Sequence, residues 1–236
     1  MKLKFLGRGA AFNIKEGNTS AYFIEDEKLF LVDCGESVFK ELVNRDILSQ
    51  IKEIYVLISH THSDHCGSLG SLGLYCQFVL QNKLKIIVPH DEDYIQSLKN
   101  LMILFGNTEK AYEFIYDDEL DNFFNSFLSV RYELTKHDYM LVCYSFVFET
   151  VDGGIFYSAD TRTPENLLRF IDTHKYIDCI YMEATDLKVV NDIHMNIEVL
   201  DAVVPGELKN KMWMMHLRGE ECKTLIKKAG FNVVSC

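Results

Sequence analysis

Short apolar runs separated by tight turns dominate the first 60 residues of the chain. The runs are rich in leucine, isoleucine, valine and phenylalanine, and glycine or asparagine stands in several of the turns, which is typical of strands that enter a core. In the segment 37–48, by contrast, apolar residues recur with a spacing near 3.6, which predicts an amphipathic helix. The predicted strands of this region are 3–6, 20–24, 29–32 and 54–58.

The rest of the chain alternates between helical and strand-like patterns. Residues 107–127 are the exception: aromatic and acidic residues mix there without a clean period, and we interpret them as a cap, a lid or a contact surface. The predicted helices are 67–80, 91–105, 164–171, 196–204 and 218–228. The predicted strands are 85–88, 127–134, 140–151, 155–158, 177–182, 211–215 and 231–234. This order predicts an α/β fold of two packed sheets with helices outside, an αββα sandwich.

The length of 236 residues suits a single domain over 1–236, with a cap or lid around 91–127. Nearly half of the residues are apolar and only three are proline, so a full core can be buried. No apolar run approaches the roughly 18 residues of a membrane span, and residues 1–6 turn polar too quickly for a secretory signal. The seven cysteines are odd in number and form no C-x-x-C pair, so we expect reduced thiols in a cytoplasmic protein.

The formal net charge of the chain is −11 at pH 7. An acidic surface repels a phosphate backbone, so a long nucleic acid is not an expected partner. Bound divalent cations would add positive charge locally and could still draw a small anionic substrate to their site. The composition therefore favours a small ligand over a polymeric one.

Four potential metal ligands fall within six residues just after the predicted strand 54–58. His60, His62, Asp64 and His65 are crowded into one loop, and such a cluster beside a buried strand is costly unless a metal coordinates it. In extended backbone His60 and His62 point to the same side, whereas the adjacent Asp64 and His65 diverge and can serve a second metal. Imidazole and carboxylate ligands suit zinc, manganese or iron.

Three further candidate ligands stand at the ends of predicted strands. His137 lies between two strands, Asp160 follows the strand 155–158, and His216 follows the strand 211–215. Functional sites in α/β sheets form in the loops past the carboxyl ends of strands. We therefore consider these three residues together with the first cluster.

The segment His60–His65 matches the H-x-H-x-D-H signature, and by it the chain resembles the metallo-β-lactamase superfamily. The supporting motifs occur in the same order as in that superfamily and cover nearly the whole chain. They are Gly17–Ser20, Val32–Gly35, Ile58–His60, Ser158–Thr161 and Met215–Leu217. The resemblance implies the metallo-β-lactamase fold, which hosts β-lactamases, thioesterases, nucleases and phosphodiesterases.

The resemblance also implies a division of the ligands between two divalent metals, zinc first of all. One metal would take His60, His62 and His137, the other would take Asp64, His65 and His216, and Asp160 would bridge them. Two metals about 3.5–4 Å apart activate a water as a nucleophile near neutral pH. By motif, Asp33 is interpreted as a hydrogen-bonding support of the metal loop.

A second motif narrows the resemblance to ribonuclease Z-like phosphodiesterases. In the ribonuclease Z group a H-E-A-T segment and a later histidine form a Glu–His pair, and here Glu183 and His194 match. Met182 stands in place of the first histidine, and the long arm that grips tRNA has no counterpart. The chain is most similar to the compact anti-Pycsar group of phages and bacteria. That likeness implies a zinc homodimer that hydrolyses cyclic mononucleotides such as cCMP and cUMP, in the host cytoplasm if the chain is phage-encoded.

The resemblance implies a mechanism as well. The activated water attacks phosphorus, Asp64 helps to orient it, and His194, oriented by Glu183, protonates the leaving 3′-oxygen to give a 5′-monophosphate. Three alternatives stay open: an RNA-processing endonuclease, a metal-containing protein that sequesters nucleotides without cleaving them, and a thioesterase or lactonase of the same fold.

Overall fold

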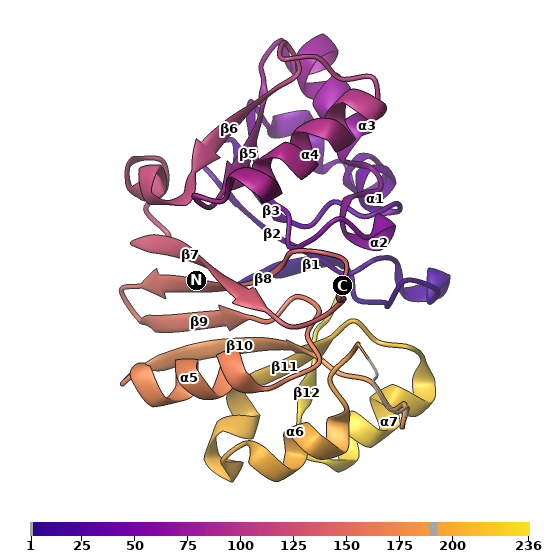
Figure 1. The fold of residues 1–236 in the computed structure, drawn as a ribbon, viewed down its shortest axis with the longest axis vertical. Helices are drawn as coiled ribbons and strands as arrows, with labels where there is room; N and C mark the ends of the chain where they lie inside the picture. Colours follow the sequence, from indigo (N-terminus) through magenta and orange to yellow (C-terminus); the bar gives the residue numbers. More distant parts are fainter. Residues whose placement is uncertain (1, 189–192) are drawn as a thin grey trace.

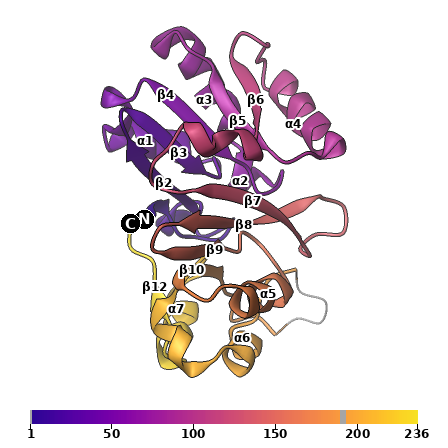
Figure 2. The ribbon, with the colours of Figure 1, turned by 90° about the vertical axis from the view of Figure 1, so that its left-hand side faces the viewer.

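The computed structural model describes residues 2–188 and 193–236. Over these residues two six-stranded sheets face each other, and helices cover the outer side of each sheet (Figure 1, Figure 2). The predicted αββα sandwich is thereby confirmed.

The first sheet has the strand order β1–β2–β3–β4–β5–β6. Pairing is antiparallel from β1 to β3 and parallel from β3 to β6. Its strands are β1 (Lys4–Gly7), β2 (Ser20–Glu25), β3 (Lys28–Val32), β4 (Glu53–Leu57), β5 (Leu84–Val88) and β6 (Tyr112–Tyr116).

The second sheet repeats this pattern, with the order β12–β11–β10–β9–β8–β7. Pairing is antiparallel from β7 to β9 and parallel from β9 to β12. Its strands are β7 (Ser129–Thr135), β8 (Cys143–Thr150), β9 (Gly153–Tyr157), β10 (Ile177–Glu183), β11 (Met212–Met215) and β12 (Asn232–Val233). Because parallel strands end on the same side of a sheet, the loops after β9, β10 and β11 gather at one edge.

The helices lie outside the sheets, except for the single turn Ser63–Cys66 at the edge of the sandwich (Figure 1). They are α1 (Val38–Asn44), α2 (Ser63–Cys66), α3 (Leu69–Tyr75), α4 (Glu92–Leu104), α5 (Glu165–Thr173), α6 (Ile197–Val203) and α7 (Glu220–Lys228). The 3-10 turns are η1 (Ile14–Glu16), η2 (Ile47–Gln50), η4 (Asp117–Asn122) and η5 (Gly206–Lys211), and η3 (Cys76–Leu80) is a π-helical turn.

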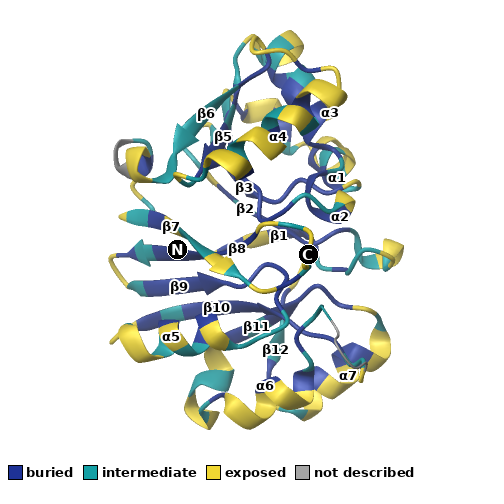
Figure 3. Cartoon of the chain, viewed as in Figure 1, coloured by how far each residue is buried: buried dark blue, intermediate teal, exposed yellow. Residues whose placement is uncertain are grey.

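Two clusters of buried apolar side chains hold these layers together. The larger one fills the space between the sheets and reaches under α1, α3 and α4, and the smaller one lies between the second sheet and α5, α6 and α7. Figure 3 shows the buried residues concentrated on the strands and the exposed ones on the outer faces of the helices. The inward-facing sides of all outer helices are therefore anchored in apolar cores.

The sequence-based interpretation of 107–127 differs from the structure. Strand β6 pairs with β5 inside this segment and extends the first sheet, and Phe124 and Phe127 are buried against Phe30 between the sheets. The strand was missed because it lies at a sheet edge and most of its residues are half-buried, so no apolar alternation marks it. The prediction of a cap or lid around 91–127 is therefore wrong for α4 and β6. Both elements belong to the sandwich itself.

One predicted helix also divides in the structure. The expected helix 37–48 ends as α1 at Asn44, and Asp46 takes a left-handed conformation with φ of 54° before the chain enters η2. A single left-handed residue interrupts the helical hydrogen bonds without changing the apolar spacing, so the pattern could not reveal it.

Candidate metal centre

The loop after β4 carries the first four candidate ligands at one edge of the sandwich. His60 is fully buried, and α2 starts one residue after His62 with Asp64 and His65 on its single turn. Glycine is required at Gly35 of the neighbouring turn, because a Cβ there would collide with the backbone carbonyl of Asp64. The close approach of these two loops fixes the ligand turn against the end of β3.

The remaining candidate ligands come from the other sheet. His137 follows β7, Asp160 follows β9 and His216 follows β11, and all three side chains are buried. They lie against the first cluster, so the structure brings all seven sequence-predicted ligands together at one edge of the sandwich.

The first group of ligands consists of three histidines. His60 Nε2 lies 2.9 Å from His62 Nδ1, which lies 3.3 Å from His137 Nε2. Three imidazole nitrogens that converge at this spacing surround a point where a cation can accept their lone pairs.

The second group combines carboxylates and histidines. The Oδ2 atom of Asp64 lies 3.4 Å from His65 Nε2 and 3.3 Å from His216 Nε2. His65 Nε2 is buried and makes no hydrogen bond within the described part of the chain. A buried nitrogen without a hydrogen bond is unfavourable in a protein interior, and metal coordination would satisfy it.

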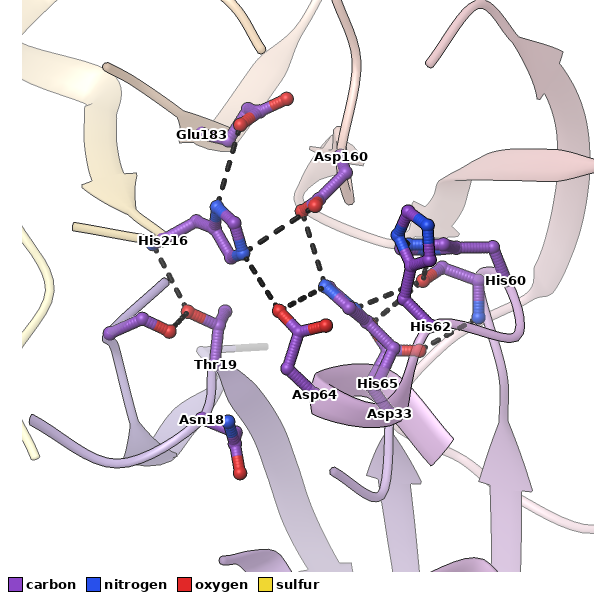
Figure 4. Close-up of polar contacts among 12 residues, drawn as sticks. Asn18, Thr19, Asp33, His60, His62, Asp64, His65, Asp160, Glu183 and His216 are labelled. Atoms are coloured by element: carbon purple, nitrogen blue, oxygen red, sulfur yellow. Dashed lines mark hydrogen bonds and ion pairs between the residues drawn. The ribbon is translucent and has the colours of Figure 1, made fainter. Parts of the chain in front are cut away.

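Asp160 lies between the two groups (Figure 4). Its Oδ1 atom is 3.3 Å from His65 Nε2, and its Oδ2 atom is 3.4 Å from His216 Nε2 and 3.6 Å from His137 Nε2. One carboxylate therefore reaches histidines of both groups, as a bridging ligand must. The donor set fits two divalent cations that share Asp160.

Asp33 orients two of these histidines from the end of β3. The fully buried carboxylate accepts hydrogen bonds from Ser59 N at 2.7 Å, Ser59 Oγ at 2.9 Å and His65 Nδ1 at 2.8 Å. Ser59 Oγ in turn lies 3.0 Å from His60 Nδ1. These contacts leave Nε2 of both rings for a metal. The predicted supporting role of Asp33 is confirmed.

The other ligand histidines have similar outer contacts. His137 Nδ1 donates to the Ile193 carbonyl at 2.7 Å, and His62 Nε2 lies 3.7 Å from Asp138 Oδ2. The sequence prediction did not single out Asp138, which directly follows the candidate ligand His137. The hydrogen bond of His137 leaves its Nε2 for the site, and Asp138 faces the outer ring nitrogen of His62.

The carboxylates change the protonation of the ligands around them. Burial keeps the pKa of His60 well below its usual value, so this imidazole is neutral and ready to coordinate. Burial alone would also lower the pKa of His216, but Asp160, Asp64 and Glu183 outweigh it and raise the pKa to about 10. The pKa of His65 is raised in the same way, because Asp160 and Asp33 outweigh the effect of burial. Without a metal, protons on these two rings balance the carboxylate charge.

Three residues at the centre adopt a strained backbone conformation. Asp33, Ala159 and His216 have φ values of 63°, 48° and 56°, in the left-handed region that residues other than glycine seldom adopt. Each stands where a strand ends beside the ligands. Such strain persists only where the surrounding structure imposes it, and it is common at functional sites.

The predicted Glu183–His194 pair is also formed. Glu183 is fully buried at the end of β10, and its Oε2 atom lies 2.8 Å from His194 Nδ1 and 3.6 Å from His216 Nδ1. Thr161 N donates a short hydrogen bond to the other oxygen of Glu183. Burial would lower the pKa of His194, but Glu183 outweighs it and raises the pKa. The ring of His194 lies 5.0 Å from that of His137, so the pair borders the ligand groups.

A family model described as Anti-Pycsar protein Apyc1 matches residues 1–234. The chain belongs to the Apyc1 family. The Anti-Pycsar protein Apyc1 of Bacillus phage BSP38 is 29% identical, over 97% of this chain and 93% of the phage protein. The family resemblance drawn from the motifs is confirmed.

More distant likenesses agree with this membership. The ribonuclease Z of Methanococcus maripaludis (strain C5 / ATCC BAA-1333) is 35% identical over 43% of this chain and 32% of its own length. The metallo-β-lactamase fold protein YhfI from Bacillus subtilis superposes with a TM-score of 0.73 at 21% identity, covering 98% of this chain and 94% of YhfI. The fold is thus the metallo-β-lactamase fold, as predicted.

The family match and the ligand clusters support a metal-dependent, phosphodiesterase-type hydrolase role for this Apyc1-family chain, and the clusters support the use of divalent metal. Within the ranges 2–188 and 193–236, no helix is both long and apolar enough to cross a membrane.

Proposed function

We propose that the chain is a dinuclear metal phosphodiesterase that hydrolyses 3′,5′-cyclic mononucleotides, such as cCMP, cUMP, cAMP and cGMP, to 5′-monophosphates. The observation that carries the proposal is the position of Asp160 between two ligand groups, with the Glu183–His194 pair beside them. Two cations that share a carboxylate suit in-line displacement at phosphorus.

The ligands divide between the two cations as their contacts suggest. His60, His62 and His137 would hold one cation, Asp64, His65 and His216 the other, and Asp160 would contact both. We propose zinc, and manganese or iron would accept the same donors. When bound, the cations supply Lewis acidity, which neutralises phosphoryl charge and lowers the pKa of water.

The chain itself supplies the proton for the leaving group. The hydrogen bond from His194 Nδ1 to Glu183 fixes the orientation and tautomer of the ring, so Nε2 is the nitrogen that delivers a proton to the leaving 3′-oxygen. The raised pKa of His194 keeps a larger fraction of it protonated near neutral pH. Asp64, whose Oδ2 atom contacts His65 and His216, would help to orient the attacking water.

A small substrate suits the surroundings of the centre better than tRNA. The net charge of −11 opposes binding of a long phosphate backbone. The H-E-A-T histidine of the ribonuclease Z group is replaced by Met182, which is fully buried in the apolar core under the second sheet. We propose that the chain acts as a homodimer in the cytoplasm, and in a phage-infected host it would counteract cyclic-nucleotide antiphage signalling.

Product analysis tests the proposal. Zinc- or manganese-loaded protein is incubated with cyclic mononucleotides, cyclic dinucleotides and a tRNA precursor, and the products are resolved by chromatography. We expect 5′-monophosphates from the cyclic mononucleotides, and turnover more than about 100-fold slower from an Asp160→Asn variant. Cleavage of the tRNA precursor alone would instead make the chain an RNA-processing endonuclease, and an entirely intact panel would favour sequestration without cleavage.

A further inference from the structure

A tyrosine and an arginine stack on each other beside the ligand groups. Arg162 Cζ lies 4.0 Å from the ring centre of Tyr139, which is a close cation–π contact. We propose that this Tyr139–Arg162 stack is the platform on which the nucleobase of the substrate stacks. The inference rests on the proposed function and assigns its base-recognition site.

Both residues of the stack are tied to candidate ligands. Tyr139 follows His137 by two residues and Arg162 follows Asp160 by two residues, which allows at most about 7.6 Å between the α-carbons of each pair. Arg162 N donates to the Lys136 carbonyl at 2.7 Å, so the two loops are joined next to the stack. The loops that carry the stack are therefore joined next to His137 and the shared carboxylate.

Asp138 fixes the turn that presents the tyrosine. Its Oδ1 atom accepts a hydrogen bond from Met140 N at 2.7 Å, and its Oδ2 atom faces His62 Nε2 at 3.7 Å. The turn is thus braced against a ligand imidazole. A ring held in place before binding loses little conformational freedom when a ligand stacks on it.

Contacts within the described part of the chain do not explain why Tyr139 and Arg162 are placed together. Tyr139 is 71% exposed, so packing within the chain does not account for its position. Arg162 forms no ion pair with another described residue, although carboxylates outnumber cations in the chain. Aromatic rings and guanidinium groups both stack on the π-face of a base, and this stacking tolerates different bases.

The shape of a cyclic mononucleotide matches this arrangement. Its phosphodiester is fused to the ribose, so the base is held rigidly apart from the phosphorus. With the phosphodiester between the ligand groups, a base directed toward the loops of Tyr139 and Arg162 can reach the stack.

The test compares two substrates with the intact metal-loaded protein. One is cAMP, and the other is 1-O-methylribose 3′,5′-cyclic phosphate, which has the same diester but no base. The variants are Tyr139→Ala and Tyr139→Phe. The matched control is Tyr176→Ala, because Tyr176 is 67% exposed and has Lys175 Nζ 5.3 Å from its ring centre, but it precedes β10 at the end opposite Glu183.

We expect Tyr139→Ala to lower the ratio of kcat/KM for cAMP to that for the base-free diester by about 10- to 100-fold, through KM of cAMP. Tyr139→Phe should keep the wild-type ratio because the ring remains, and Tyr176→Ala should keep it as well. Zinc content should equal that of the wild type in all variants. A ratio unchanged in Tyr139→Ala, or an equal loss on both substrates, would refute the platform. A wild-type protein that hydrolyses neither diester would refute the proposed function itself.

Discussion

Replacement of Asp33 with asparagine should weaken metal binding without unfolding the sandwich. The carboxylate accepts three buried hydrogen bonds, two from Ser59 and one from His65 Nδ1. An asparagine has one oxygen where the aspartate has two, so its amide nitrogen must face at least one of these donors. The left-handed backbone of Asp33 is retained, because asparagine tolerates this conformation better than alanine does.

The expected magnitude follows from these contacts. One buried donor left without an acceptor costs about 1–3 kcal/mol. Loss of an outer contact that orients a ligating histidine typically weakens metal binding about 10- to 100-fold, which corresponds to about 1.4–2.8 kcal/mol. The two ranges overlap, and we expect the zinc Kd of Asp33→Asn to rise about 10- to 100-fold.

Competition with a zinc-binding fluorophore measures this change. The control is Glu25→Gln, because Glu25 also accepts backbone hydrogen bonds, from Asn125 N at 2.6 Å and Ser126 N at 2.9 Å, but stands at the far end of β2 from the ligands. Glu25→Gln should lower Tm and leave the zinc Kd unchanged. Wild-type zinc affinity in Asp33→Asn, or an equal loss of affinity in Glu25→Gln, would refute the proposed control of His65 by Asp33.

Three further predictions concern the centre itself. Asp160→Asn should lower kcat by more than about 100-fold, since the shared carboxylate contacts histidines of both groups; near-normal turnover would contradict this. Glu183→Gln should move the basic limb of the kcat–pH profile to lower pH. The reason is that loss of the carboxylate lowers the pKa of His194, which must be protonated to act as an acid. An unmoved limb would argue against His194 as the general acid. Zinc binding near pH 7 should release about two protons, from His65 and His216, because the pKa values of both rings are raised without metal. A zinc titration in weak buffer measures this release, and a titration without acidification would contradict the prediction.

The sequence predicted which candidate ligands the fold brings together, because their positions obey simple rules. The crowding of His60–His65 after a buried strand marks a metal loop, and the strand-end rule brought His137, Asp160 and His216 to the same place. The apolar pattern of a sequence shows where strands end, so polar residues that follow a strand end can be recognised as candidate ligands.

Other features could not be read from the sequence, for physical reasons. Strand β6 is half-buried at an edge and has no clean apolar alternation, so its pairing with β5 is decided by tertiary contacts. The Tyr139–Arg162 stack joins two loops that are distant in sequence. The left-handed conformation of Ala159 is imposed by the surrounding fold, and nothing in its side chain favours it.

Metal reconstitution tests the central claim most directly. Metal-free protein is titrated with zinc, and at each step native mass spectrometry counts the bound ions while chromatography measures hydrolysis of cAMP. We predict two zinc ions per chain and full turnover to 5′-AMP only when both are bound. Full activity with a single ion per chain, or no hydrolysis with two ions bound, would contradict the dinuclear phosphodiesterase.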